Sequence, residues 1–111
     1  MESDRRHAER VHFEPLRVRV YGTREGILLD LSKGGARVQF PSALPIDSEI
    51  TLQIDWNARA LHVQARVLRC TARRVQLESA TLARTEYDVA LEFSRVDPEA
   101  AMLIRQILER K

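Results

Sequence analysis

The chain contains 111 residues, 44% of them apolar, and its formal net charge is +2 at pH 7. This length and composition predict a single domain with one hydrophobic core, since domains commonly contain about 100–200 residues. No apolar run approaches the ~20 residues that a membrane-spanning helix needs, and the N-terminus is charged, so we expect a cytoplasmic protein that does not insert into a membrane.

Residues 1–12 are rich in charge and show neither strand nor helix periodicity, which predicts a flexible arm that becomes ordered on binding. Arg6 and Arg10 are four residues apart, so a helical turn or a wrapped arm would point both guanidinium groups the same way. Such a pair suits phosphates. The spacing alone is weak evidence, because it recurs at Arg69 and Arg73, which we expect to lie apart from the site.

The segment after the arm shows the period-two alternation of apolar and polar residues that is typical of half-buried strands. The predicted strands cover residues 16–20, 27–29, 36–40, 50–56, 61–67, 75–77 and 87–93. Turn-forming residues separate them, and no helical pattern lies between them. Six or seven short strands in succession predict a mainly β protein with an antiparallel barrel or sandwich.

A polar segment follows the apolar run at 27–29 and carries the most informative pattern in the chain. Asp30 and Ser32 are two residues apart, so in a strand they project from the same face. Gly34 and Gly35 allow a sharp turn and leave room for a ligand. A carboxylate beside a hydroxyl suits the edge of a base, because a carboxylate can accept hydrogen bonds from the N1 and N2 donors of guanine. An ordinary hairpin loop is the alternative interpretation of these residues.

The period changes near the C-terminus. Asp97 and Pro98 predict a helix start, with the aspartate as N-cap and the proline at the first helical position. The predicted helix covers about residues 98–110 and has an apolar stripe at helical spacing. The members of this stripe are Ala100, Leu103, Ile104, Ile107 and Leu108. We expect the stripe to pack on the barrel; binding of a partner or a second copy is the alternative.

Arg6-x-x-x-Arg10 followed by Asp30-x-Ser32-x-x-Gly35 resembles the two-part signature of PilZ domains, bacterial receptors for the second messenger cyclic di-GMP. Both halves are complete and stand in the family's order and approximate separation. The strand pattern and the C-terminal helix match as well, so the resemblance covers nearly the whole chain.

The resemblance implies a stand-alone PilZ-like β-barrel over residues 13–111, preceded by a ligand-clamping arm over residues 1–12. One departure is Ala90, which stands where many members of the family have glycine. This difference leaves the expected fold intact and concerns only how closely a backbone can approach at that position.

The resemblance also implies a function and a set of site residues. Arg6 and Arg10 would clamp the phosphates and the O6/N7 edge of guanine, and Asp30 and Ser32 would bind the base. Arg5 precedes the first motif arginine, and in the family an arginine there is associated with two stacked ligands, so we expect two cyclic di-GMP per chain. The expected ligand-binding residues are Arg5, Arg6, Arg10, Asp30, Ser32, Gly34 and Gly35.

The role implied is that of an adaptor in bacterial motility or biofilm regulation, whose arm orders over the barrel and changes the surface shown to an unidentified downstream protein. No enzyme activity, metal or cofactor is expected. The histidines have no metal-ligand spacing, Cys70 is the single cysteine, and no nucleophile with a base and an oxyanion hole is evident.

Two other functions remain open from the residues. Five arginines and no acid lie between Trp56 and Leu77, which is compatible with a small basic β-barrel that binds single-stranded nucleic acid. Aromatic residues make up only 5% of the chain, which argues against this function because bases stack on aromatic side chains. A PilZ-like protein-interaction module without nucleotide binding is the third possibility, and the complete motif argues against it.

Overall fold

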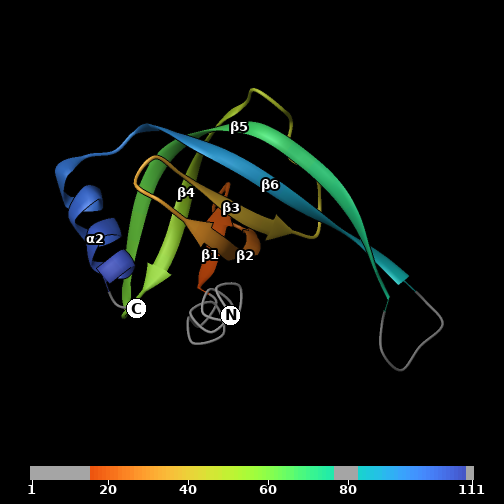
Figure 1. Ribbon diagram of the computed structural model, residues 1–111, viewed down its shortest axis with the longest axis horizontal. Coiled ribbons are helices and arrows are strands. Elements are labelled where there is room, and N and C mark those ends of the chain that lie inside the picture. Colours follow the sequence, from red (N-terminus) through yellow and green to blue (C-terminus); the bar gives the residue numbers. More distant parts are fainter. Residues whose placement is uncertain (1–15, 77–82, 110–111) are drawn as a thin grey trace, which may run out of the picture.

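Six antiparallel strands close into a barrel in the spatial order β1-β2-β3-β6-β5-β4 (Figure 1). The computed structural model describes residues 16–76 and 83–109. The strands are β1 (Arg17–Val20), β2 (Arg24–Leu31), β3 (Gly35–Phe40), β4 (Glu49–Trp56), β5 (Arg59–Gln76) and β6 (Ala83–Arg95), and the helix that follows is α2 (Pro98–Glu109). The expected antiparallel barrel with a C-terminal helix is confirmed, with six strands.

Strand alternation fills the barrel interior with apolar side chains. In β4, for example, Ile50, Leu52 and Ile54 are at most 3% exposed, whereas Thr51 between them faces solvent. Closing the sheet turns every inward face toward one common centre, so a single core forms. Its largest fully buried side chains are Phe40, Leu52, Ile54, Ile104 and Ile107.

The longest strands, β5 and β6, extend beyond the barrel as a two-stranded hairpin (Figure 1). Pairing of β5 with β4 reaches Arg66, and pairing of β6 with β3 reaches Tyr87. Beyond these residues, the described parts of β5 and β6 pair with each other alone. The sequence predicted separate strands at 61–67 and 75–77, but β5 is one continuous strand from Arg59 to Gln76, where the described residues of this part of the chain end.

The helix begins and packs as expected. The Asp97 carboxylate accepts a hydrogen bond of 2.8 Å from the backbone N–H of Ala100, which is the N-cap interaction. Ala100, Leu103, Ile104 and Ile107 are buried in the common core, and α2 lies against β5. The apolar stripe therefore serves the barrel. Within the described residues, no helix is long and apolar enough to cross a membrane.

Candidate ligand-binding groove

A β-bulge in β2 turns Asp30 to the outside of the barrel. Leu28 pairs with Val38 and Asp30 pairs with Arg37, so Leu29 is an extra residue without a pairing partner in β3. In a regular strand, Asp30 would share the inward face of Leu28, which is 2% exposed. The extra residue reverses this alternation, and the Asp30 side chain is exposed.

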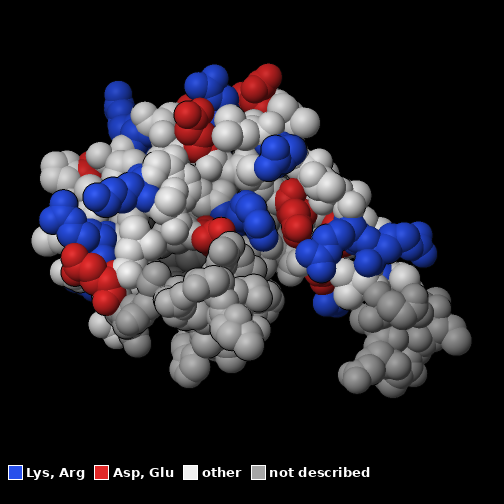
Figure 2. Space-filling view, in the orientation of Figure 1, with Lys and Arg blue, Asp and Glu red and all other residues white. Residues whose placement is uncertain are grey.

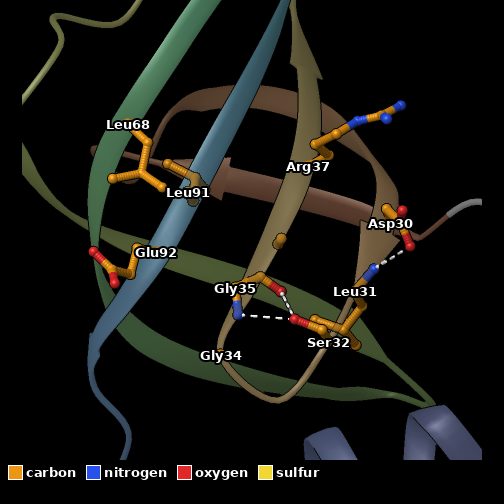
Figure 3. A pocket seen from close by; sticks show the side chains of 10 residues that line it. Asp30, Leu31, Ser32, Gly34, Gly35, Arg37, Leu68, Leu91 and Glu92 are labelled. Carbon is orange, nitrogen blue, oxygen red and sulfur yellow. Dashed lines mark hydrogen bonds between the residues drawn. The ribbon is translucent and has the colours of Figure 1, made fainter.

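The turn between β2 and β3 is fixed by Ser32. Its backbone N–H donates to the carbonyl oxygen of Gly35 at 2.9 Å, and its hydroxyl donates to the same oxygen at 3.2 Å. The backbone N–H of Gly35 in turn donates to Ser32 Oγ at 3.1 Å (Figure 3). Ser32 therefore holds the turn closed, and its hydroxyl proton is used within the turn.

The two glycines of the motif have different surroundings. A Cβ added to Gly35 would lie 2.3 Å from the carbonyl oxygen of Leu91 on β6, so the close approach of β3 to β6 requires glycine at this position. A Cβ added to Gly34 would meet no atom within 4 Å. Gly34 therefore faces open space, where a ligand could approach it.

Asp30, Ser32 and both glycines line one groove of about 330 Å³ on the barrel surface. In Figure 3, Asp30 and Ser32 lie on one side of this groove, and Leu68 and Leu91 lie on the other. The lining residues are Asp30, Leu31, Ser32, Gly34, Gly35, Ala36, Arg37, Leu68, Leu91 and Glu92. The polar side chains of Asp30 and Ser32 thus face the apolar side chains of Leu68 and Leu91 across the groove. This arrangement suits a flat ligand with polar groups on its rim.

One carboxylate oxygen of Asp30 already accepts a hydrogen bond within the protein. Its Oδ1 accepts a hydrogen bond of 3.0 Å from the backbone N–H of Leu31, which orients the carboxylate. No described residue donates a hydrogen bond to its Oδ2. Arg37, its partner across β2 and β3, extends to the same side in Figure 3, but the two form no ion pair.

Three of the expected site residues, Arg5, Arg6 and Arg10, lie outside the described residues, so their placement relative to the groove stays a prediction. The first described residue, Leu16, is hydrogen-bonded to β2, since its carbonyl oxygen accepts from the backbone N–H of Leu28 at 2.8 Å. Leu16, where the described chain begins, therefore lies beside Leu28, which is two residues before Asp30 on β2.

Sequence reasoning missed the residues that complete the groove. Arg37 lies on β3, while Leu68 comes from β5, and Leu91 and Glu92 come from β6. No spacing rule connects Leu68 with Asp30, because their shared groove depends on the pairing of β3 and β5 with β6 and on the β-bulges in β2 and β5. Arg37 was detectable in principle, since it lies two residues after Gly35 and so shares its side of β3. Among the described residues, no cluster of His, Cys, Asp and Glu could hold a metal ion.

The fold and the groove define a small antiparallel β-barrel with a surface site where one strand ends and the next begins. Among solved structures, the chain is similar to the PilZ domain of YcgR from Escherichia coli, a structure that contains cyclic di-GMP. The TM-score is 0.66 at 17% sequence identity, covering 86% of this chain and 79% of that one. This similarity shows a shared fold.

The sequence matches the PilZ domain family over residues 4–110, and the chain belongs to that family. A search of curated proteins found no match.

Proposed function

We propose that this chain is a receptor for cyclic di-GMP and acts as an adaptor rather than as an enzyme. The observation that carries the proposal is the joint position of Asp30, Ser32 and Gly34 on one groove, where the β2 bulge and the turn present them to solvent. Membership of the PilZ family supports the same ligand, as does the similarity in fold to a YcgR domain that contains it.

Asp30 is the group that would recognise guanine. An exposed carboxylate accepts hydrogen bonds, and guanine offers adjacent N1–H and N2–H donors. Adenine has an acceptor at N1, so two acceptors would face each other across the contact. A site built on hydrogen bonds rejects an analogue that cannot pair with it, and this contact therefore favours guanine.

Ser32 and Gly34 would act next to this contact. Because the Ser32 hydroxyl is bonded within the turn, its main role is to hold the turn in shape, and a free lone pair remains for a ligand donor. Gly34 leaves open space at the turn, so the ligand can lie against the backbone.

The arm would supply the charges for the phosphates. Arg10 is six residues before Leu16, and six residues of chain reach at most about 20 Å. Leu16 is hydrogen-bonded to Leu28 on β2, the strand that leads to Asp30. A chain that starts from Leu16 is therefore long enough for Arg6 and Arg10 to contact a ligand in the groove. Guanidinium groups bind phosphates through paired hydrogen bonds.

Signalling would follow from ordering of the arm. A ligand that carries two phosphate charges would draw the arginines over the groove, so the free and bound proteins would present different surfaces to a downstream protein. The groove itself needs no rearrangement for this. We expect ligand binding to protect the backbone amides of residues 1–12 from hydrogen exchange and to leave the exchange of the barrel amides unchanged.

The experiment that tests this function is a calorimetric titration of the purified chain with cyclic di-GMP, cyclic di-AMP, GTP and a short single-stranded oligonucleotide. We expect saturable binding of cyclic di-GMP and at least about 100-fold weaker binding of cyclic di-AMP, because a site that pairs with a donor discriminates strongly against its loss. Equal affinity for the two dinucleotides would remove the role given to Asp30. Binding of the oligonucleotide alone would favour the nucleic-acid alternative.

A further inference from the structure

A second β-bulge lies in β5, opposite β6. Val67 pairs with Leu91 and Arg69 pairs with Ala90, so Leu68 is an extra residue between the two pairs. Consecutive residues of a regular strand point to opposite faces, but Leu68 and Arg69 are both exposed. The bulge therefore presents two neighbouring side chains of β5 to solvent together.

Leu68 lines the same groove as Asp30 and Ser32. It is 50% exposed, whereas neighbouring Leu91 is 3% exposed, so Leu68 supplies most of the apolar surface that a ligand could cover. Figure 3 shows its side chain across the groove from Asp30. A base that pairs its edge with Asp30 would extend its ring system across the groove to this side, where Leu68 can cover it.

Arg69 lines an adjoining groove of about 210 Å³, which shares Arg37 with the first groove. Arg37, Ala90 and Arg69 occupy one row across β3, β6 and β5. Neighbouring strands lie about 4.8 Å apart, so the two arginines start about 10 Å apart and can converge on one anion. Ala90, which lies between them on β6, has a small side chain and leaves room for an anion between the two arginines.

The charges of the adjoining groove favour an anion that also carries a donor. Neither Arg37 nor Arg69 forms an ion pair with another described residue. Asp88 also lines the groove, but its Oδ2 accepts from Arg73 Nη1 at 3.3 Å, which offsets its charge. Asp88 Oδ1 is buried with no hydrogen-bond partner in the described part of the chain, so a donor there would satisfy it.

We propose that the β5 bulge is a ligand-binding element outside the two sequence motifs, in which Leu68 covers the face of a base and Arg69 binds a phosphate of the same nucleotide ligand. This inference rests on the proposed function, since it extends the groove of Asp30. It also revises the expectation from sequence spacing that Arg69 lies apart from the site.

The test compares Leu68→Ser and Arg69→Ala with matched controls in calorimetric titrations with cyclic di-GMP at low and high salt. Met102→Ser is the control for Leu68, because Met102 is also 50% exposed but lies on α2. Arg74→Ala is the control for Arg69: it removes the same charge from the same strand, at a residue that lines neither groove.

We expect Leu68→Ser to weaken binding by about fivefold through lost apolar contact, with an unchanged salt dependence. We expect Arg69→Ala to weaken it by about tenfold and to reduce the salt dependence, because a charge-assisted contact to phosphate is lost. Both controls should bind like the parent. Thermal unfolding of each variant checks that the barrel is intact.

The possible failures are distinguishable. If the parent binds cyclic di-GMP and both bulge variants bind as tightly as their controls, the bulge proposal is overturned and the proposed function stands. If the parent does not bind cyclic di-GMP at all, the proposed function fails, and the bulge proposal fails with it.

Discussion

Gly35 shows how a motif residue can serve the fold before it serves a ligand. Its backbone lies so close to β6 that a Cβ would be 2.3 Å from the carbonyl oxygen of Leu91, and a backbone atom cannot move aside as the end of a side chain can. Gly34 has no such neighbour. Neither of these glycines has a positive φ, so the difference between them is steric alone.

Alanine substitutions at these two positions should therefore differ. We expect Gly35→Ala to lower the free energy of unfolding by about 1–3 kcal/mol, the usual effect of overpacking. Gly34→Ala should change it by less than about 0.5 kcal/mol, as for most exposed positions. Denaturant unfolding measures both, and equal losses would contradict the steric explanation. Reduced ligand binding by Gly34→Ala would then report on the ligand contact without a change in the barrel.

At the scale of single residues, the sequence predicted part of the groove. The spacing of Asp30 and Ser32 predicted that both face the same side, and both line the groove, although Ser32 lies just beyond the end of β2. It could not show that the bulge at Leu29 puts this side outward, because an extra residue depends on the pairing with β3. Leu68 and Glu92 could not be found either, since register between distant strands brings them to the groove.

At the scale of elements, the turn between β4 and β5 contains a local conflict. Trp56 pairs with Arg59, so Asn57 and Ala58 form a two-residue turn, with φ angles of 58° and 64°. A turn with both central residues at positive φ is a type I′ turn, in which the second residue is usually glycine. Asparagine tolerates this conformation, whereas the Cβ of alanine is crowded in it.

Ala58→Gly should therefore stabilise the protein. Relief of the crowded conformation contributes about 1–2 kcal/mol, and the greater freedom of glycine in the unfolded chain offsets about 0.5–1 kcal/mol of it. We expect a net gain of about 0.5–1 kcal/mol in the free energy of unfolding. Ala60→Gly, two residues further on and within β5, is the control and should give no gain. A loss in Ala58→Gly would contradict the assignment of the turn.

Element pairing also changes how the arginine-rich stretch of β5 is understood. The stretch has no acid in sequence, but Arg66 pairs in register with Glu49 on β4 and Glu92 on β6, and Arg73 forms an ion pair with Asp88. In Figure 2, acidic atoms lie among the basic ones next to the projecting hairpin. The neighbouring strands thus supply the missing carboxylates, which weakens the case for a nucleic-acid surface.

At the scale of the whole molecule, the proposed function assigns the groove to the barrel and the response to ligand to the arm. The barrel is closed, its core is continuous with α2, and the described lining of the groove comes from the barrel strands and the turn between β2 and β3. Arg5 would act in the arm. Two stacked ligands bring four phosphate charges together, and a third guanidinium can offset their repulsion and stack on a guanine face.

The number of ligands should therefore depend on Arg5. We expect the parent to bind two cyclic di-GMP per chain, and Arg5→Leu to shift the number toward one and to weaken the salt dependence of binding. Calorimetry gives the number directly. A parent that saturates at one ligand, with no change in the leucine variant, would rule out this role of Arg5.

The arm and the β2 groove are proposed to bind cyclic di-GMP together, so binding should depend on both Arg10 and Asp30, and calorimetric titration of Arg10→Ala and Asp30→Ala measures this dependence. We expect each variant to bind about 10- to 100-fold more weakly than the parent, since a hydrogen bond to a charged group contributes about 1.5–3 kcal/mol. Thermal unfolding of Asp30→Ala should stay unchanged, because the Asp30 side chain is exposed. Thermal unfolding of Arg10→Ala checks that this variant folds as well. If both variants bind cyclic di-GMP with the affinity of the parent, the site is assigned to the wrong residues.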